Sequence, residues 1–558
     1  MEGGGEKFKK AQRAMKDRSA LAYLNDASII TRLKDLKYYQ KTMKNDPWIR
    51  IIAPEITPPT LRDNTADVDR LIRGIKKCLH IDEVVIDFSL LKRLPHALRQ
   101  YDYRINAILH KVQTGWRLID ILSSQNDSCI YGLAVDLGSS TVVIQLVDLK
   151  SQKTIDKKSF HNPQIEIGTD ILTRIHFAAK RGGLDKLQSL LMERLNENID
   201  QLAKMHNIRT DSIVGISVAG NTTMAHFFLG MDPYWLCREP YIPVINKPEH
   251  IKSSDLGLAI NPEAPVLVFP NVGSYFGGDL IAGILASGIT HQDKVSFLVD
   301  VGTNAEVVIG NCDWLMGCAG AAGPALEGGV ADMGMMAGPG VIDKVVIDPV
   351  SSEFKIRTIE NDPTVGICGS GLIDLIAQLF LAGMIDLRGK YVAGKCNGRL
   401  VEVEGVKHLV VVTPANSGTG QALTLSQTDI DGIIRSKAAM YTILTTITNT
   451  VNISMNDINK FYIAGTFGSY IDPQSAITIG MMPDLPLETY IPLGNTSLKG
   501  AGMALVSAQA KDEIYRIRDN ITYLELNVNQ EFMNLFSAAK FIPHTDSALF
   551  PSAKTGGS

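Results

Sequence analysis

Two similar stretches of this chain constrain its fold more than any other feature. Residues 131–148 pass from an apolar, β-rich run through Asp136, a glycine and three hydroxyl residues into a second apolar run. Residues 296–309 repeat the pattern, with Asp300 in the place of Asp136. Each stretch predicts a β-hairpin with a carboxylate at the end of its first strand, next to the turn. Two such hairpins indicate an α/β fold built from two duplicated halves.

The residues at the turn of each hairpin have the chemistry of a phosphate and magnesium site. Exposed N–H and O–H groups after the carboxylate can wrap a polyphosphate, while the carboxylate holds a hydrated Mg²⁺. We therefore expect a nucleotide between the two halves, with Asp136 and Asp300 as catalytic and metal-binding residues. The phosphate-binding candidates are Gly138, Ser139, Ser140 and Thr141 in the first hairpin and Gly302, Thr303 and Asn304 in the second.

Two helix starts add candidates to this site. The apolar strand 213–220 ends at Asn221 and Thr222, whose position at a helix N-terminus offers free N–H donors to an anion or an attacking water. His226, in the same helix, is more typical of a buried, hydrogen-bonded histidine than of a ligand. A Gly-Gly-Asp turn before an apolar helix carries Asp279, a third catalytic candidate, which is either a helix cap or a contact to the metal-bound water.

Three further segments leave their role open. Asn162 and Arg174 lie in a dense polar group around a helix start at 161–180, which indicates either caps and turns or part of a site. Gly465 and Gly468 would let the backbone approach an adenosine, although a plain turn needs them too. The glycine-rich residues 317–345 favour a ligand-facing or partner-facing loop over an ordinary helix or strand.

Composition excludes several classes of protein. A net charge of −4 gives little support to nucleic-acid binding, and no apolar run reaches the ~18 residues of a membrane span. The charged N-terminus is unlike a signal peptide, so we expect a cytoplasmic protein. The 7 cysteines are scattered without C-x-x-C or plant-type cluster spacing, which argues against disulfides and an iron–sulfur cluster.

The same features predict the domain organisation. We expect a helical arm over residues 1–50, a small α/β linking domain over 51–128 and a tail over 542–558 that is disordered after Ser552. Between them we expect two ATPase subdomains, with their boundary near residue 290: the first over 129–290 and the second over 291–541.

Five ordered motifs make the chain resemble the reductive activators of corrinoid proteins. These activators belong to the superfamily of acetate and sugar kinases, heat-shock chaperone ATPases and actin, which implies a duplicated actin-like, ribonuclease H-like α/β fold. The motifs are AGNTTMAHFFLGMDP (219–233), DVGTNAEVVIGN (300–311), AGPALEGG (322–329), GICGSGLID (366–374) and AGTFGSYIDPQSAITIGMMPD (464–484).

The resemblance implies a specific activity. Such activators use ATP to return an inactive Co(II) corrinoid, carried by a partner protein, to the Co(I) state needed in methyltransferase systems such as O-demethylases. The resemblance also implies that Glu306 belongs to the second phosphate motif. It further implies that residues 465–468, which include Thr466 and Phe467, are the adenosine motif. ATP and Mg²⁺ are the implied cofactors, a corrinoid protein is the implied partner, and homodimer formation stays open.

The chain departs from that pattern at its N-terminus. Family members typically carry a [2Fe–2S] domain there, whereas this chain has no cysteine before Cys78. We therefore expect no cluster in this chain, and electrons that come from a separate ferredoxin-like donor or from a missing module.

Three rival functions remain on the same fold. A small-molecule kinase would use Asp279 as its catalytic base, and a nucleotide-gated scaffold would turn ATP over incidentally. An activator of the acyl-CoA dehydratase type would hold a cluster between subunits, for which Cys312, Cys318 and Cys368 give only weak support.

Overall fold

The computed structural model divides the chain into two compact units, which are described separately. The first unit comprises Lys37–Ala286 and Thr496–Asp519, and the second comprises Ser287–Asn495 and Asn520–Ser558. The structure describes residues 46–125, 129–249, 251–302, 305–320, 331–465, 468–526 and 529–553.

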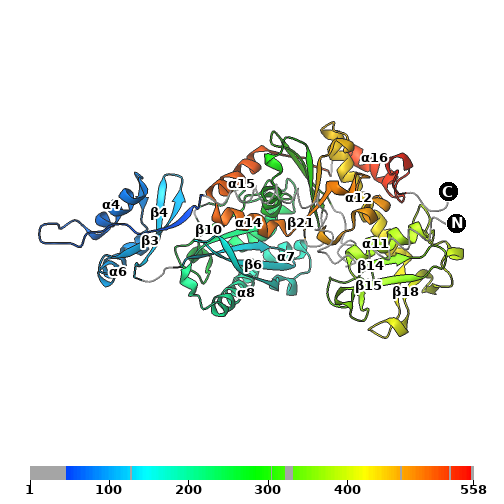
Figure 1. Ribbon diagram of the computed structural model, residues 1–558, viewed down its shortest axis with the longest axis horizontal. Coiled ribbons are helices and arrows are strands. Elements are labelled where there is room, and N and C mark those ends of the chain that lie inside the picture. Colours follow the sequence, from blue (N-terminus) through cyan, green and yellow to red (C-terminus); the bar gives the residue numbers. More distant parts are fainter. Residues whose placement is uncertain are drawn as a thin grey trace. The chain divides into compact units, whose positions relative to one another are not determined.

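The first unit begins with a small α/β domain (Figure 1). Its sheet has the strand order β1-β3-β4-β2, formed by β1 (Ile49–Ile52), β3 (Ile105–Val112), β4 (Gly115–Ser123) and β2 (Val84–Val85). The helices are α4 (Asp67–Leu79), α5 (Phe88–Leu91) and α6 (Leu94–Gln100). The indole nitrogen of Trp48 donates to the carbonyl of Ala504 at 2.9 Å, which attaches this domain to the rest of the unit.

A six-stranded sheet forms the centre of the first unit. Its order is β7-β6-β5-β8-β10-β9, in which β5, β8 and β10 are parallel and β5, β6 and β7 form an antiparallel meander. The strands are β5 (Tyr131–Leu137), β6 (Thr141–Asp148), β7 (Lys153–His161), β8 (Ile213–Gly220), β9 (Ile251–Lys252) and β10 (Pro265–Val268).

Successive side chains of these strands point to opposite faces of the sheet, and helices pack on both faces. Leu133 and Val135 face a core that includes α7 (Ile171–Ala178), α8 (Gly183–Met205) and α9 (Thr222–Leu229). On the opposite face, a Cβ on Gly132 would lie 3.0 Å from the Leu505 side chain, so this glycine makes room for α14. The remaining helices are α10 (Gly278–Ser287), α14 (Thr496–Val506) and α15 (Ala508–Asn520).

The second unit repeats this topology. Its sheet has the order β21-β20-β11-β12-β13-β22, again with an antiparallel meander followed by parallel strands. The strands are β11 (Ser296–Val301), β12 (Ala305–Gly310), β13 (Leu315–Gly320), β20 (Lys460–Ala464), β21 (Tyr490–Gly494) and β22 (Ile521–Tyr523). The predicted duplication of an α/β fold around two hairpins is therefore confirmed.

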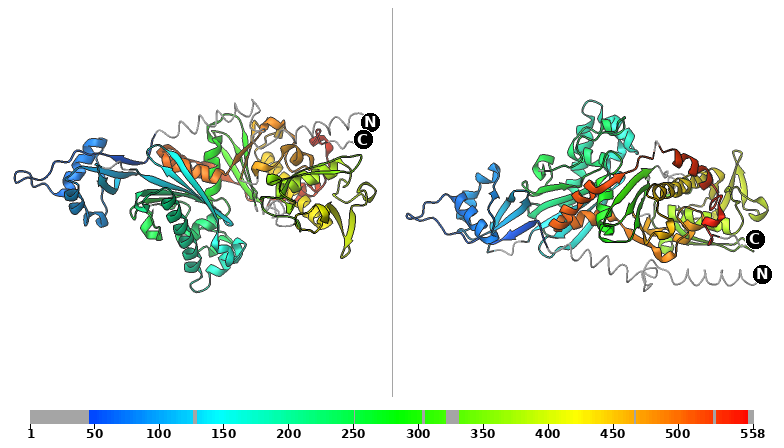
Figure 2. Two further views of the ribbon diagram at one scale, coloured as in Figure 1. Left: turned by 60° about the horizontal axis from the view of Figure 1, so that its bottom comes forward. Right: turned by 90° about the horizontal axis from the view of Figure 1, so that it is seen from above.

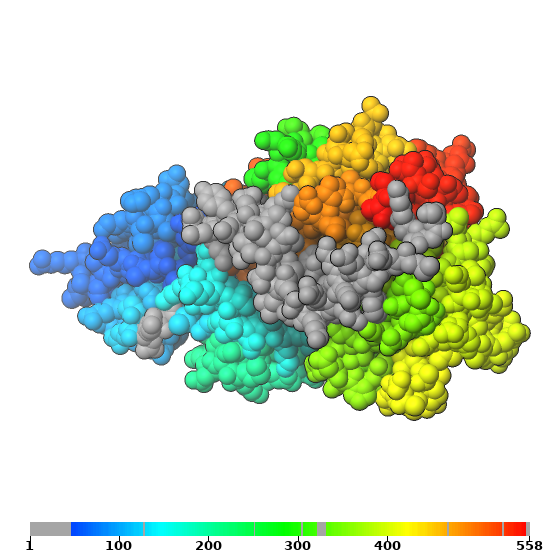
Figure 3. Space-filling model, turned by 45° about the vertical axis from the view of Figure 1, so that its right-hand side comes forward, coloured from blue at the N-terminus to red at the C-terminus, as the bar shows by residue number. Residues whose placement is uncertain are grey.

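Within the residues that the structure describes, two three-stranded sheets and four α-helices complete the second unit. The sheets are β15-β14-β16 and β17-β18-β19, formed by β14 (Val341–Ile347), β15 (Phe354–Thr358), β16 (Gly366–Ile367), β17 (Leu400–Val403), β18 (Val406–Val412) and β19 (Leu423–Ser426). The helices are α11 (Gly369–Leu381), α12 (Gln427–Thr450), α13 (Pro473–Thr478) and α16 (Gln530–Ala539). α16 lies along α12 (Figure 2), and the surface view shows the red C-terminal segment beside the yellow segment that contains α12 (Figure 3).

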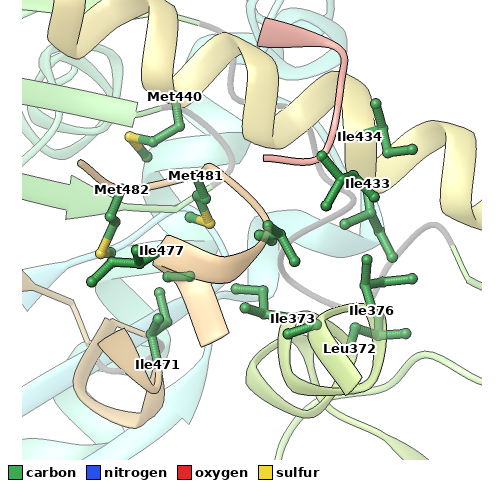
Figure 4. Packing of buried hydrophobic residues seen from close by; sticks show 14 of the residues in the cluster. Leu372, Ile373, Ile376, Ile433, Ile434, Met440, Ile471, Ile477, Met481 and Met482 are labelled. Carbon is green, nitrogen blue, oxygen red and sulfur yellow. The ribbon is translucent and has the colours of Figure 1, made fainter. Parts of the chain in front are cut away.

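The core of the second unit is rich in isoleucine and methionine. Met440 of α12 lies near Met481 and Met482, and Ile373 of α11 belongs to the same buried cluster (Figure 4). Met333 is also in this core, whereas Met336 is 68% exposed. The methionines around the glycine-rich segment therefore divide between core filling and the surface.

The structure differs from the predicted organisation in three places. Residues 496–519 belong to the first unit although they follow the second in sequence. The two ends of 317–345 are strand, because 317–320 lie in β13 and 341–345 lie in β14; residues 331–340 form turns and irregular structure, and 321–330 are outside the described residues. The predicted tail packs in the core as far as Ala553, because Ile542 and Phe550 are buried.

One predicted helix is divided, and another lies mostly outside the described residues. The apolar pattern predicts one helix around 90–100, but α5 ends at Leu91 and α6 starts anew at Leu94 with Pro95 in its first turn. The predicted arm over 1–50 lies outside the described residues up to residue 45. In the part of the chain that is described, no helix combines the length and apolar character that crossing a bilayer requires.

Candidate functional site

The candidate residues of the first unit gather at one edge of its sheet. Asp136 is near the carboxyl end of β5, and Asn221 directly follows the carboxyl end of β8. Because β5, β8 and β10 are parallel, these ends meet at the same edge. Gly277, from the segment after β10, approaches so closely that a Cβ there would lie 2.5 Å from Asn221 Cα. The structure thus brings together three segments that are far apart in sequence.

Two carboxylates interact at this edge. The pKa of Asp279 is raised to about 6, chiefly by burial and further by the negative charge of Asp136. Asp136 accepts a hydrogen bond of 2.7 Å from Ser497 Oγ, at the start of α14. A divalent cation would relieve the repulsion between the carboxylates, and oxygen ligands of this kind suit Mg²⁺. Sequence reasoning missed Ser497, whose only signal is a hydroxyl residue at a helix start.

The start of α9 has the features of an anion site. The side chain of Asn221 caps the helix by accepting from Met224 N at 2.9 Å, and Thr222 Oγ1 donates to Gly273 O at 3.2 Å. Both side chains therefore fix local structure, while the first backbone N–H groups of the helix remain the groups suited to an anion.

His226 is a structural residue, as predicted. Its Nδ1 lies 2.7 Å from Thr222 O, and Val244 N donates to its Nε2 at 3.0 Å. Both bonds are satisfied by a neutral ring with the proton on Nδ1. Burial lowers the pKa of His226, which favours the same state.

The turn between β5 and β6 contains the predicted phosphate-binding residues. Ser140 is exposed and Ser139 is half-buried at its tip, with Thr141 beginning β6. A Cβ on Gly138 would lie 2.3 Å from the carbonyl oxygen of Thr141, so the tight turn requires glycine at this position.

The second unit carries its motif on the equivalent strands. Asp300 of β11 is in register with Glu306 of β12 on one side and with Ala464 of β20 on the other. Gly465 follows β20 with φ of +84°, and a Cβ there would lie 2.8 Å from Asp300 Oδ1. This glycine therefore permits the close approach of the backbone to the Asp300 carboxylate.

The other residues of the second motif are only partly described. Gly302 directly follows β11, while Thr303, Asn304, Thr466 and Phe467 lie outside the described residues. A Cβ on Gly468 would lie 2.7 Å from Ile463 Cγ2, which ties this glycine to packing against β20.

The cysteines considered as cluster ligands have different surroundings. Cys312 is exposed, whereas Cys318 on β13 and Cys368 before α11 are buried. Burial raises the pKa of the Cys318 thiol, which disfavours the thiolate that binds metals. Across the described ranges, no three His, Cys, Asp or Glu side chains are grouped as a metal site. A Mg²⁺ ion bound at Asp136 would need water and phosphate oxygens as further ligands.

Family comparisons match almost the whole chain. Residues 39–128 match the RACo linker region, residues 131–292 the RACo middle region, and residues 294–554 the C-terminal domain of RACo, described as the ASKHA domain. The three matches follow one another in order, and each of the last two contains one of the hairpins; the third also includes residues 496–519, which pack in the first structural unit.

Individual relatives agree with these matches. The chain is 31% identical over 500 residues to the corrinoid activation enzyme RamQ of Eubacterium limosum. The aligned residues cover 88% of this chain and 82% of the relative. The chain is 24% identical over 440 residues to a [Co(II) methylated amine-specific corrinoid protein] reductase of Methanosarcina barkeri, covering 73% and 76%. A solved reductive activator for a corrinoid, iron–sulfur protein superposes with a TM-score of 0.82 at 38% identity, covering 91% of this chain and 81% of that one.

Proposed function

The chain belongs to the family of reductive activators of corrinoid proteins, and we propose that it uses ATP to promote reduction of Co(II) to Co(I) in a partner corrinoid protein. The observation that carries this proposal is the alignment with RamQ, a corrinoid activation enzyme, over 500 residues at 31% identity. The duplicated sheets, each with an acidic hairpin, provide the fold on which ATP would act.

The site of the first unit supports ATP and Mg²⁺ as cofactors. Asp136 would hold the hydrated cation, and the turn that begins at Gly138 would contact the phosphates. Asp279, with its pKa of about 6, is half-ionised near that pH and is suited to accept a proton from an attacking water. Asp300 and Gly465 would form the corresponding nucleotide contacts in the second unit.

ATP would act by changing how tightly the chain binds the corrinoid protein. If the ATP-bound chain binds the Co(II) corrinoid protein more tightly than the nucleotide-free chain, the difference between the two affinities is available to change the cobalt ligands. Removing a cobalt ligand would make Co(II) easier to reduce. The electron itself would come from a ferredoxin-like donor, and hydrolysis would return the chain to its low-affinity state.

A spectroscopic assay tests this proposal. The chain is mixed with a Co(II) corrinoid protein, ATP, Mg²⁺ and a low-potential reductant, and Co(I) is followed by its absorbance. We expect acceleration that needs ATP and disappears in Asp136→Ala or Asp300→Ala. Asp185→Ala, an exposed residue on α8, is the matched control and should behave like the unaltered protein. Equal rates with and without ATP would refute the proposal, and sugar-dependent ADP release would indicate a kinase instead.

A further inference from the structure

Three successive carbonyls of the turn between β5 and β6 are bound by groups behind it. Asn162 Nδ2 donates to Gly138 O at 3.0 Å, and the backbone N–H of Asn162 donates to Ser140 O at 2.9 Å. Arg174 Nη1 donates to the carbonyl between them, Ser139 O, at 2.8 Å. We call Asn162 and Arg174 the brace. It fixes the orientation of every peptide plane in the tip of the turn.

The orientation of these planes decides where the turn can bind a ligand. Asn162 Nδ2 and Arg174 Nη1 both lie 3.8 Å from Met224 Sδ, so the brace approaches the turn from one side. In a planar trans peptide, the carbonyl of one residue and the N–H of the next point in opposite directions. The N–H groups of Ser139 and Ser140 are therefore directed away from the brace. Neither donates to another backbone carbonyl within the described residues.

Arg174 is an unusual residue to find in this position. Its side chain is 0% exposed, its Nε donates to Gly168 O at 2.7 Å, and its Nη2 has no hydrogen-bond partner in the described part of the chain. No carboxylate of the described residues forms an ion pair with it. The carboxylate of Asp170 raises the pKa of Arg174 without forming an ion pair with it, and it accepts hydrogen bonds of 2.6 and 2.8 Å from Thr173.

A buried cation that no carboxylate contacts directly is unfavourable for the free protein. Burial lowers the pKa of Arg174, since desolvation disfavours the charged form and outweighs the opposing effect of Asp170. A negative ligand bound on the other side of the turn would add a further counter-charge.

We propose that Asn162 and Arg174 are positioning residues of the nucleotide site, which direct the Ser139 and Ser140 N–H groups toward an ATP phosphate and place a buried positive charge behind them. This proposal rests on the proposed function, because it assigns the turn to ATP. It adds that the phosphates, and not the adenosine, receive the benefit of the buried charge.

The test compares Arg174→Met with Arg174→Lys, Asn162→Ala and the control Arg181→Met, which removes an exposed arginine just after α7. Affinities for ATP and for adenosine are measured by calorimetry, and the thermal midpoint is measured without nucleotide. In Arg174→Met we expect ATP affinity to fall about 10-fold to 100-fold while adenosine affinity is unchanged. The midpoint falls to the extent that Gly168 O and Ser139 O lose their donors, so the ratio of the two affinities is the decisive readout. Arg174→Lys should lose less than Arg174→Met, and Asn162→Ala should also weaken ATP selectively.

Two results would overturn the proposal. Unchanged ATP affinity in both Arg174→Met and Asn162→Ala would show that the brace does not serve the site. Equal losses for ATP and adenosine, together with a lower midpoint, would show that the brace only supports the fold. If Arg174→Met does not fold, Asn162→Ala and Arg174→Lys provide the same comparison. Absence of ATP binding in the unaltered chain would instead contradict the proposed function.

Discussion

Replacing Asp279 by asparagine should stabilise the nucleotide-free protein while impairing ATP turnover. The structure raises the pKa of this carboxyl from 3.8 to about 6, by burial and by the charge of Asp136. A difference of roughly two pH units corresponds to about 3 kcal/mol of unfavourable free energy in the folded state once the group is ionised. Asparagine keeps the shape and removes the charge, so it should recover up to about 3 kcal/mol at pH 8.

The sign of the effect follows from protonation of the folded and unfolded states. Below pH 4 the carboxyl is protonated in both states and contributes nothing. Between about pH 4 and 6 the unfolded chain loses its proton first, so this group lowers stability progressively, and above pH 6 its full effect remains. Asp279→Asn should therefore be less sensitive to pH across this range than the unaltered chain.

Urea unfolding at pH 4, 6 and 8, without nucleotide, measures this difference. Asp185→Asn is the control, because that side chain is exposed on α8. ATP hydrolysis should fall at least 100-fold in Asp279→Asn if the residue is a general base. A variant that is no more stable than the parent at pH 8, or that has the same dependence on pH, would refute the assigned environment of Asp279.

Three further variants test other parts of the structure. Gly465→Ala must place a methyl group where φ is +84° and Asp300 Oδ1 is 2.8 Å away, so Co(I) formation with ATP should fall more than 10-fold in the absorbance assay. Lys344→Met leaves Asp374, 1% exposed, without its 2.9 Å ion-pair partner, and urea unfolding should show a loss of about 3–5 kcal/mol. Ser497→Ala removes the 2.7 Å hydrogen bond to Asp136. The rate of Mg²⁺-dependent ATP hydrolysis should fall about 10-fold, while the thermal midpoint should stay unchanged.

Local sequence patterns predicted the elements that carry the site. The hairpins and β8 over 213–220 lie where the apolar pattern predicts them, and the helical spacing over 67–79 predicts the helix found as α4. For α12, the sequence predicts a cap within 424–433 and a helix over 434–448, whereas the helix begins at Gln427, because Ser426 and Asp429 form a capping box. The cap therefore lies in the predicted segment, but at its start.

Other features depend on contacts that a sequence does not display. Glycine at 317 and 320 argued against a strand, yet β12 supplies the hydrogen bonds that hold both residues in β13. Ser497 reaches Asp136 across 361 positions of sequence, and no spacing rule connects them. Asn162 and Arg174 stood out as a polar group, but only the three-dimensional structure shows that they bind consecutive carbonyls of one turn.

The return of residues 496–519 to the first unit affects how the protein is synthesised. The face of the first sheet around Gly132 is covered by Leu505, so a nascent chain exposes this apolar surface until the ribosome has added α14. At 5–20 residues per second, the roughly 200 intervening residues take about 10–40 seconds. The first unit therefore completes its folding after most of the second unit has been translated, and during that interval its uncovered sheet is a natural substrate for chaperones.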